Sequence, residues 1–162
     1  MTESPPTGLA PEINPAIRGM MRAARDMLQH EHSLLGSLGF KPLLLGAGKT
    51  SFSLDLPARF GDGSGMIHGG FLTVVLDSLF GLTVFTAMEE FKPIATINLR
   101  TDYIKEVPAG SRVNCDSVCE GVRNEVAYVS GRLTLDADKS LIAIASGAFM
   151  VGTKGPAKGS RL

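Results

Sequence analysis

One stretch of the chain constrains the fold more than any other. From Gly69 to Met88 nearly every residue is apolar, and Asp77 is the only formally charged side chain within it. About twenty apolar residues are enough to span a bilayer, but a charge at the centre of such a span costs about 2.5 to 3.5 kcal/mol, and no basic flank follows. The sequence therefore favours a helix, from about His68 to Glu89, that is buried inside a protein core.

After Pro93 the hydrophobic pattern changes from helical to alternating. A period of two between apolar and polar side chains is typical of strands with one buried face. The alternating pattern covers four runs: Ile94 to Lys105, Arg112 to Glu120, Glu125 to Asp136 and Leu141 to Val151. The links between them are short and rich in turn-forming residues, which favours hairpins. This half of the chain is predicted to be an antiparallel meander.

Two further elements are predicted before the glycine-rich loop at residues 61–65. Apolar side chains recur at helical spacing from about Asn14 to Leu35, and Leu43 to Leu56 alternates as one bent strand or a strand pair. A helix that is apolar on all sides needs cover on all sides. The predicted class is therefore α+β, with the arrangement of the hotdog fold. In it a curved antiparallel sheet wraps around a long central apolar helix, here with an extra N-terminal helix.

Length and composition limit how the chain is organised. With 162 residues, 44% of them hydrophobic, the chain suits a single domain. We expect a flexible N-terminus over residues 1–12, the hotdog domain over 13–151 and a flexible tail over 152–162. The 16 Lys and Arg residues equal the 16 Asp and Glu residues, so there is no basic field of the kind that attracts nucleic acid.

The sequence predicts neither a secretory signal nor a disulfide. The first residues contain no basic stretch followed by an apolar run. Cys115 and Cys119 are four residues apart in a predicted strand, which separates them by about 13 Å, too far for a disulfide. A reduced, cytoplasmic setting without a membrane partner fits these features best.

The residues that suggest chemistry lie around the start of the apolar helix. His68-Gly69-Gly70 leads into the helix N-terminus, where unpaired amides and the helix dipole can stabilise an oxyanion. Asp77 needs either a structural hydrogen-bond partner or a role in a site. The eight residues from Gly69 to Asp77 cover roughly 12 Å of helix, so both cannot touch one carbonyl within a single helix. A second, antiparallel copy would bring them together, so we expect a homodimer, or a tetramer built as a dimer of dimers.

These residues resemble a known family as an ordered set. The set comprises three motifs: His68-Gly69-Gly70, then Asp77, then Thr96-Ile97-Asn98-Leu99. It is similar to the phenylacetyl-CoA and human-type acyl-CoA thioesterase branch of the hotdog superfamily, and the likeness covers roughly residues 40 to 151. The resemblance implies hydrolysis of an aryl or medium-chain acyl-CoA, without a metal or an organic cofactor.

The resemblance also implies roles for single residues. Asp77 acts as general base or nucleophile, the Gly69 amide polarises the thioester carbonyl, His68 fixes the loop and substrate, and Thr96 lies near the catalytic water. One position departs from the pattern, because six residues before the histidine the branch commonly has Asn or Gln and this chain has Asp62. A carboxylate only accepts hydrogen bonds unless it is protonated, so Asp62 either alters the site or turns away from it.

Three more residues are candidates for substrate binding: Gly70, Arg123 and Asn124. Gly70 follows the amide that would hold the oxyanion. Arg123 and Asn124 occupy a predicted hairpin turn from which they can reach the phosphates of CoA. An ordinary solvated turn is the simpler interpretation of these last two residues.

Two other functions are compatible with the same fold. A non-catalytic acyl-CoA binding or regulatory module would keep the fold while Asp62 abolishes hydrolysis. A hydratase or dehydratase needs an acid and a base presented together, for which His68 and Asp77 would have to serve, but the His-Gly-Gly arrangement favours hydrolysis. In each case acyl specificity is expected to depend on large side chains of the apolar helix: Phe71, Phe80, Phe85 and Met88.

Overall fold

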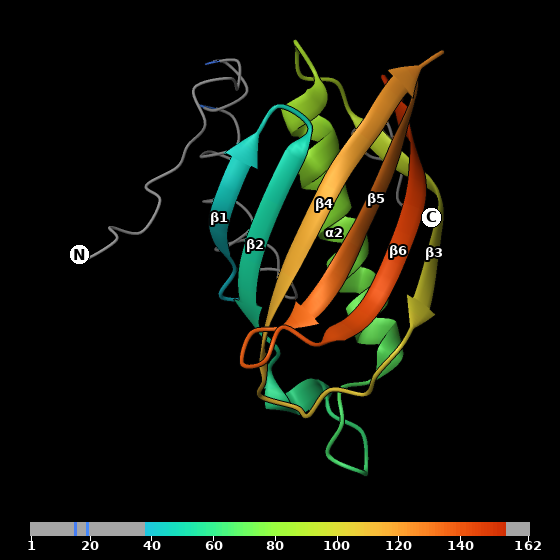
Figure 1. Ribbon diagram of the computed structural model, residues 1–162. Helices are drawn as coiled ribbons and strands as arrows, with labels where there is room; N and C mark the ends of the chain where they lie inside the picture. Colours follow the sequence, from blue (N-terminus) through green and yellow to red (C-terminus); the bar gives the residue numbers. More distant parts are fainter. Residues whose placement is uncertain (1–14, 16–18, 20–37, 155–162) are drawn as a thin grey trace, which may run out of the picture.

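The computed structural model describes residues 15, 19 and 38–154. These residues form one six-stranded antiparallel sheet and one long helix (Figure 1). In chain order the elements are β1 (Lys41–Gly46), β2 (Lys49–Asp55), the 3-10 helix η2 (Ala58–Phe60), α2 (Gly69–Ala87), β3 (Ile94–Tyr103), β4 (Arg112–Arg123), β5 (Val126–Leu135) and β6 (Leu141–Val151). The predicted hotdog fold is confirmed. The helix predicted from Asn14 to Leu35 and most of the two predicted flexible ends fall outside the described residues.

The sheet places the strands in the order β1-β2-β4-β5-β6-β3. After β2 the chain passes through α2, which lies along one face of the sheet, and β3 then joins the far edge beside β6 (Figure 1). β4, β5 and β6 form an antiparallel meander, whereas β3 pairs with β6 and not with β4, so the predicted meander through all four runs is wrong at β3. β1 and β3 are therefore the edge strands, and β3 is ten residues long.

α2 is buried on the side that faces the sheet. Ten of its nineteen residues are buried, among them Leu76 and Phe80. On the other side Val74 is exposed and Asp77 and Ser78 are half-buried. Cover on all sides was expected from the sequence, but six strands wrap only part of the helix circumference. The helix is long and apolar enough to cross a membrane by length and composition, and in this fold half of it lies inside the protein.

Buried hydroxyls and a glycine fix α2 against the sheet. The Thr83 hydroxyl lies 2.7 Å from that of Thr50 and 2.6 Å from that of Ser117, which are themselves 2.9 Å apart. The three groups satisfy one another, so none is left unpaired in the core. At Gly131 of β5 an added Cβ would lie 2.7 Å from the ring of Phe80. The helix thus packs directly onto the backbone of a central strand, which sets the position of its central carboxylate.

Candidate active site

The loop before α2 is tied to the body of the protein. Gly61 and Ile67 form an antiparallel bridge across it, and the His68 N–H donates to the carbonyl of Phe60 over 3.1 Å. These main-chain hydrogen bonds fix the direction in which the chain enters the helix.

His68 is the N-cap of α2. Its Nδ1 accepts a hydrogen bond from the Gly70 N–H (3.1 Å), and its carbonyl accepts one from the Phe71 N–H (2.9 Å). The amide of Gly69, the first helical residue, has no acceptor within the helix. Because Nδ1 accepts, a neutral His68 carries its proton on Nε2. The helix start therefore offers the Gly69 N–H and the His68 Nε2–H as hydrogen-bond donors to a bound molecule.

Asp77 has a side-chain partner in the structure, Thr96. The hydroxyl of Thr96, on β3, donates to Asp77 Oδ1 over 2.8 Å. Asp77 is half-buried and Thr96 is exposed, because both lie on the side of α2 that the sheet leaves open. The structure thus brings these two residues together, and the hydrogen bond orients the carboxylate.

A cavity of about 280 Å³ adjoins this pair. Its polar lining includes Asp77, Ser78 and Thr96, and most of the remaining lining is apolar. The apolar walls include Leu38, Phe40, Leu54, Phe85, Ile94 and Phe149. Such a pocket, apolar with a few polar groups at one point, is typical of sites for small ligands.

The large side chains expected to shape this pocket only partly do so. Phe85 lines it, whereas Phe71 and Phe80 are buried in the core against the sheet. The sequence did not identify Leu38 or Phe40, which precede β1 and reach the cavity from a distant part of the chain. Their apolar character was visible, but nothing local distinguished them from ordinary core residues.

Asp62 faces its own loop. Its Oδ1 accepts hydrogen bonds from Ser64 Oγ (2.6 Å), Ser64 N–H (2.8 Å) and Met66 N–H (3.2 Å). The hydrogen bonds from the Ser64 side chain and backbone lower the pKa of Asp62, and the Met66 N–H adds to the effect. At neutral pH Asp62 is therefore an ionised acceptor that closes a turn.

Arg123 and Asn124 lie away from the other predicted site residues. They occupy the β4–β5 hairpin, whose neighbouring Val122 lines a hollow with Met88 at the end of α2. Asn124 and the next residue have φ of 50° and 62°, which is the geometry of a tight two-residue hairpin turn. Within one chain this turn is at the end of the molecule opposite the start of the helix (Figure 1).

The sequence reasoning gave no role to Tyr103, which contacts the start of the helix. Its hydroxyl donates to the carbonyl of Gly69 over 2.7 Å and is also hydrogen-bonded to the hydroxyl of Thr73. An aromatic residue with a polar end at the terminus of an edge strand was the available signal. Thirty-four positions separate it from Gly69, so no local pattern joined the two.

Both cysteines are free, as the sequence predicted. Burial raises the pKa of the Cys115 thiol to about 12, which keeps it protonated and unreactive at neutral pH. Among the residues that the structure describes, no three His, Cys, Asp or Glu side chains are grouped to hold a metal ion.

A sheet of this topology laid against one long helix, with a carboxylate midway along the helix, defines a hotdog-fold protein. The family model described as "Thioesterase superfamily" matches residues 64–142. A Halobacterium salinarum protein that is named only provisionally as an esterase is 29% identical over 135 residues, which cover 75% of this chain and 85% of the relative. The chain is therefore similar to the thioesterase superfamily over residues 64–142 and has the hotdog fold.

Solved structures agree with this similarity. An asparagine-to-aspartate mutant of the phenylacetic acid degradation protein PaaI from Thermus thermophilus is 28% identical, with a TM-score of 0.63 over 72% of this chain and 96% of that one. A Streptococcus mutans protein bound to acetyl CoA has a TM-score of 0.66 at 19% identity, over 77% of this chain and 98% of that one. The likeness to PaaI supports the PaaI branch that the sequence motifs suggested.

Proposed function

We propose that this protein hydrolyses acyl-CoA thioesters to a free acid and CoA. The similarity to the thioesterase superfamily supports a hydrolase that acts on thioesters in general. The observation that supports hydrolysis of acyl-CoA in particular is the carboxylate of Asp77. Thr96 orients this carboxylate at 2.8 Å on the wall of an apolar cavity. An acyl group in that cavity has its carbonyl next to the one carboxylate of the lining.

Asp77 has two possible parts in the reaction. As general base it removes a proton from water, the water oxygen bonds to the carbonyl carbon, and the carbon–sulfur bond breaks to release CoA thiolate. As nucleophile its own oxygen bonds to that carbon and displaces the thiolate, and water then hydrolyses the mixed anhydride. In both routes Thr96 holds the carboxylate, while a Gly69 amide stabilises the oxyanion and His68 Nε2–H donates to the substrate.

The proposal requires a homodimer. Gly69 and Asp77 of one helix are roughly 12 Å apart, so the amide that meets a given Asp77 has to come from a second copy. β3 is an edge strand ten residues long, and the open side of α2 beside it carries Asp77. Antiparallel pairing of two β3 strands would place the two open helix sides together, and a dimer of dimers is compatible with it.

The substrate we propose is an aryl or medium-chain acyl-CoA. The cavity volume of 280 Å³ corresponds to about nine water molecules at about 30 Å³ each. This matches the bulk of a phenylacetyl group or of an aliphatic chain of similar size. CoA as the carrier is supported by the related fold that holds acetyl CoA. In an antiparallel dimer the β4–β5 hairpin approaches the partner's helix start, so Arg123 and Asn124 with the partner's Gly70 would face the CoA phosphates. The two free cysteines suit the reducing cytoplasm that we propose as its location.

One observation favours a second candidate, a non-catalytic acyl-CoA binding module. Asp62 stands where the branch commonly has an amide, and its lowered pKa keeps it from donating a hydrogen bond at neutral pH. If that donor is essential, the protein binds acyl-CoA without hydrolysing it.

Thiol release from a panel of aryl, short, medium and long acyl-CoAs separates the two candidates. We expect wild type to hydrolyse aryl or medium-chain substrates and Asp77→Asn to lose at least about 100-fold in kcat with folding and mass unchanged. Asp62→Asn keeps an oxygen for the loop and adds an N–H donor, so its activity should be equal or higher. Equal activity in wild type and Asp77→Asn would remove Asp77 from the mechanism, and saturable binding without thiol release would support the binding module.

A further inference from the structure

A series of hydroxyl groups reaches the first turn of α2 from the end of β3. Tyr103, the last residue of β3, donates its phenol proton to the carbonyl of Gly69 over 2.7 Å. The hydroxyl of Thr73 is hydrogen-bonded to the same phenol oxygen. The Thr73 hydroxyl also lies 3.5 Å from the Gly69 carbonyl, so the phenol, this hydroxyl and the carbonyl form one hydrogen-bonded cluster. Successive hydrogen bonds of this kind polarise and strengthen one another.

These groups hold one peptide plane from both sides. The peptide between Gly69 and Gly70 has its carbonyl bound by Tyr103 and its N–H bound by His68 Nδ1 at 3.1 Å. That plane shares the Gly69 Cα with the preceding peptide, whose N–H is the proposed oxyanion donor. A rotation of the held plane would turn that N–H and also release the His68 ring.

The ring of Tyr103 packs on the same point of the backbone. A Cβ added to Gly69 would lie 3.3 Å from Tyr103 Cζ and 3.5 Å from its hydroxyl oxygen. An alanine at position 69 would therefore require the phenol ring to shift by a few tenths of an ångström. This close approach gives a physical reason for glycine as the first helical residue.

We propose that Tyr103, supported by Thr73, is a positioning residue that fixes the direction of the Gly69 amide and the tautomer of His68. The inference rests on the proposed thioesterase function, because its catalytic consequence is the orientation of the oxyanion donor. Tyr103 acts through the Gly69–Gly70 peptide and not on the substrate. Its loss should therefore lower kcat and leave KM nearly unchanged.

The test compares wild type with Tyr103→Phe, which keeps the ring and deletes the hydroxyl. Removing one oxyanion donor costs about 10²–10³-fold in kcat, so loosening one should cost about tenfold, with KM within about twofold. Exchange of the Gly70 amide proton, followed by NMR, should speed up because the peptide is no longer held. Thr73→Val should lower kcat by a smaller factor, Thr73→Ser should restore it, and Tyr103→Phe with Thr73→Val should be no worse than Tyr103→Phe alone.

Tyr128→Phe is the matched control, since Tyr128 is the other tyrosine of the chain and is exposed on β5. It should match wild type in kcat and in Gly70 exchange. A Tyr103→Phe protein with wild-type kcat, with a raised KM alone, or with unchanged Gly70 exchange would overturn the proposal. If wild type hydrolyses no acyl-CoA, the proposed function fails, and the exchange measurement still decides whether Tyr103 holds the peptide.

Discussion

Gly70 lies so close to the histidine before it that a side chain would displace the ring. An added Cβ would be 3.1 Å from His68 Nδ1 and 3.2 Å from Cε1. Loss of an N-cap costs about 1 kcal/mol, while alanine gains about 0.8–1 kcal/mol over glycine in a helix. We therefore expect Gly70→Ala to change the free energy of unfolding by less than about 1 kcal/mol and to lower kcat about tenfold, because His68 is moved. Urea unfolding and thiol release measure the two quantities.

Gly63→Ala is the control for this substitution. Gly63 lies in the loop that leads into α2, and a Cβ there would meet nothing within 4 Å. The control should keep wild-type activity and stability. A Gly70→Ala protein that is as active as wild type would show that the histidine cap has no part in the reaction.

Within α2, Gly81 lies in the wall of the cavity. A Cβ there would be 3.4 Å from Ile94 Cδ1, an ordinary contact with the end of a flexible side chain. We expect Gly81→Ala to stabilise the fold by up to about 1 kcal/mol and to reduce the room for the acyl group by about one methyl. The kcat/KM of the longest accepted substrate should then fall about tenfold or more, while shorter substrates are unaffected.

The same acyl-CoA panel measures this change in chain-length preference. Gly121→Ala in β4, where an added Cβ meets nothing within 4 Å, provides a control that should leave the preference unchanged. An equal loss on all substrates would mean that the acyl group does not enter this cavity.

The elements that periodicity predicted well are those with one continuous hydrophobic pattern. The predicted helix from His68 to Glu89 is observed as Gly69–Ala87, and each of the four alternating runs became a strand. Leu43 to Leu56 proved to be a strand pair, since Gly48 has a φ of 69° that suits a tight turn. The hydrophobic pattern records which side of an element is buried, and this was enough to predict the type and extent of these elements.

The site was only partly predictable because its contacts join distant residues. Asp77 was identified as the lone charge of the apolar helix and Thr96 by the resemblance to a family, and their hydrogen bond at 2.8 Å followed from the fold. The Tyr103 contact with the helix start and the approach of Phe40 to the cavity depend on strand order. A strand order in which β3 lies beside β6 cannot be read from periodicity, because every run alternates in the same way.

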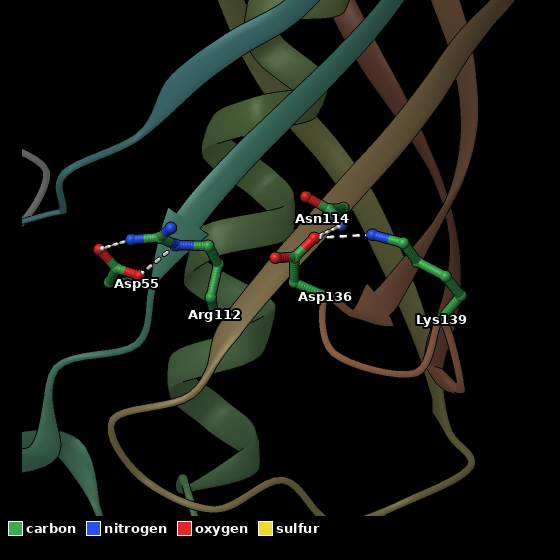
Figure 2. A network of polar contacts seen from close by, with 5 residues as sticks. All are labelled: Asp55, Arg112, Asn114, Asp136 and Lys139. Atoms are coloured by element: carbon green, nitrogen blue, oxygen red, sulfur yellow. Dashed lines mark hydrogen bonds and ion pairs between the residues drawn. The ribbon is translucent and has the colours of Figure 1, made fainter. Parts of the chain in front are cut away.

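For the molecule as a whole, the free energy of unfolding is expected to depend on pH through Asp55 and Asp136 and their hydrogen-bond partners (Figure 2). Hydrogen bonds from Arg112, at 2.7 and 3.1 Å, hold the pKa of Asp55 below its ordinary value of 3.8. Lys139 and then Asn114 lower the pKa of Asp136. When folding lowers the pKa of a carboxyl group, the folded state gains stability at pH values above the pKa of the unfolded state. This gain is lost as the pH falls through the pKa of the folded state. Asp55→Asn should therefore be less stable than wild type at pH 6, and the difference should shrink as the pH falls through the folded-state pKa of Asp55.

Denaturant unfolding at several pH values measures this difference. Asp116→Asn, which changes an exposed aspartate of β4, is the control and should follow wild type throughout. A constant difference between Asp55→Asn and wild type from pH 6 to below pH 3 would mean that the loss has a cause other than the charge.

Dimerisation also concerns the molecule as a whole, because the proposed site needs two copies of the chain. Ile97 is 50% exposed and sits at the irregularity between Thr96 and Asn98 in the edge strand β3. Lysine on an edge strand opposes pairing with another strand. We expect Ile97→Lys to shift the mass from dimer to monomer and to lower kcat/KM at least about 100-fold, because each Asp77 loses the partner's oxyanion donor.

Leu43→Lys places the same charge on the opposite edge, where Leu43 of β1 is 49% exposed. This matched control should remain dimeric and active if β3 forms the interface. Light scattering after size exclusion gives the mass, and circular dichroism checks that both variants are folded. A folded Ile97→Lys monomer with full activity would show that one chain completes the site, whereas dissociation by Leu43→Lys alone would place the interface at β1.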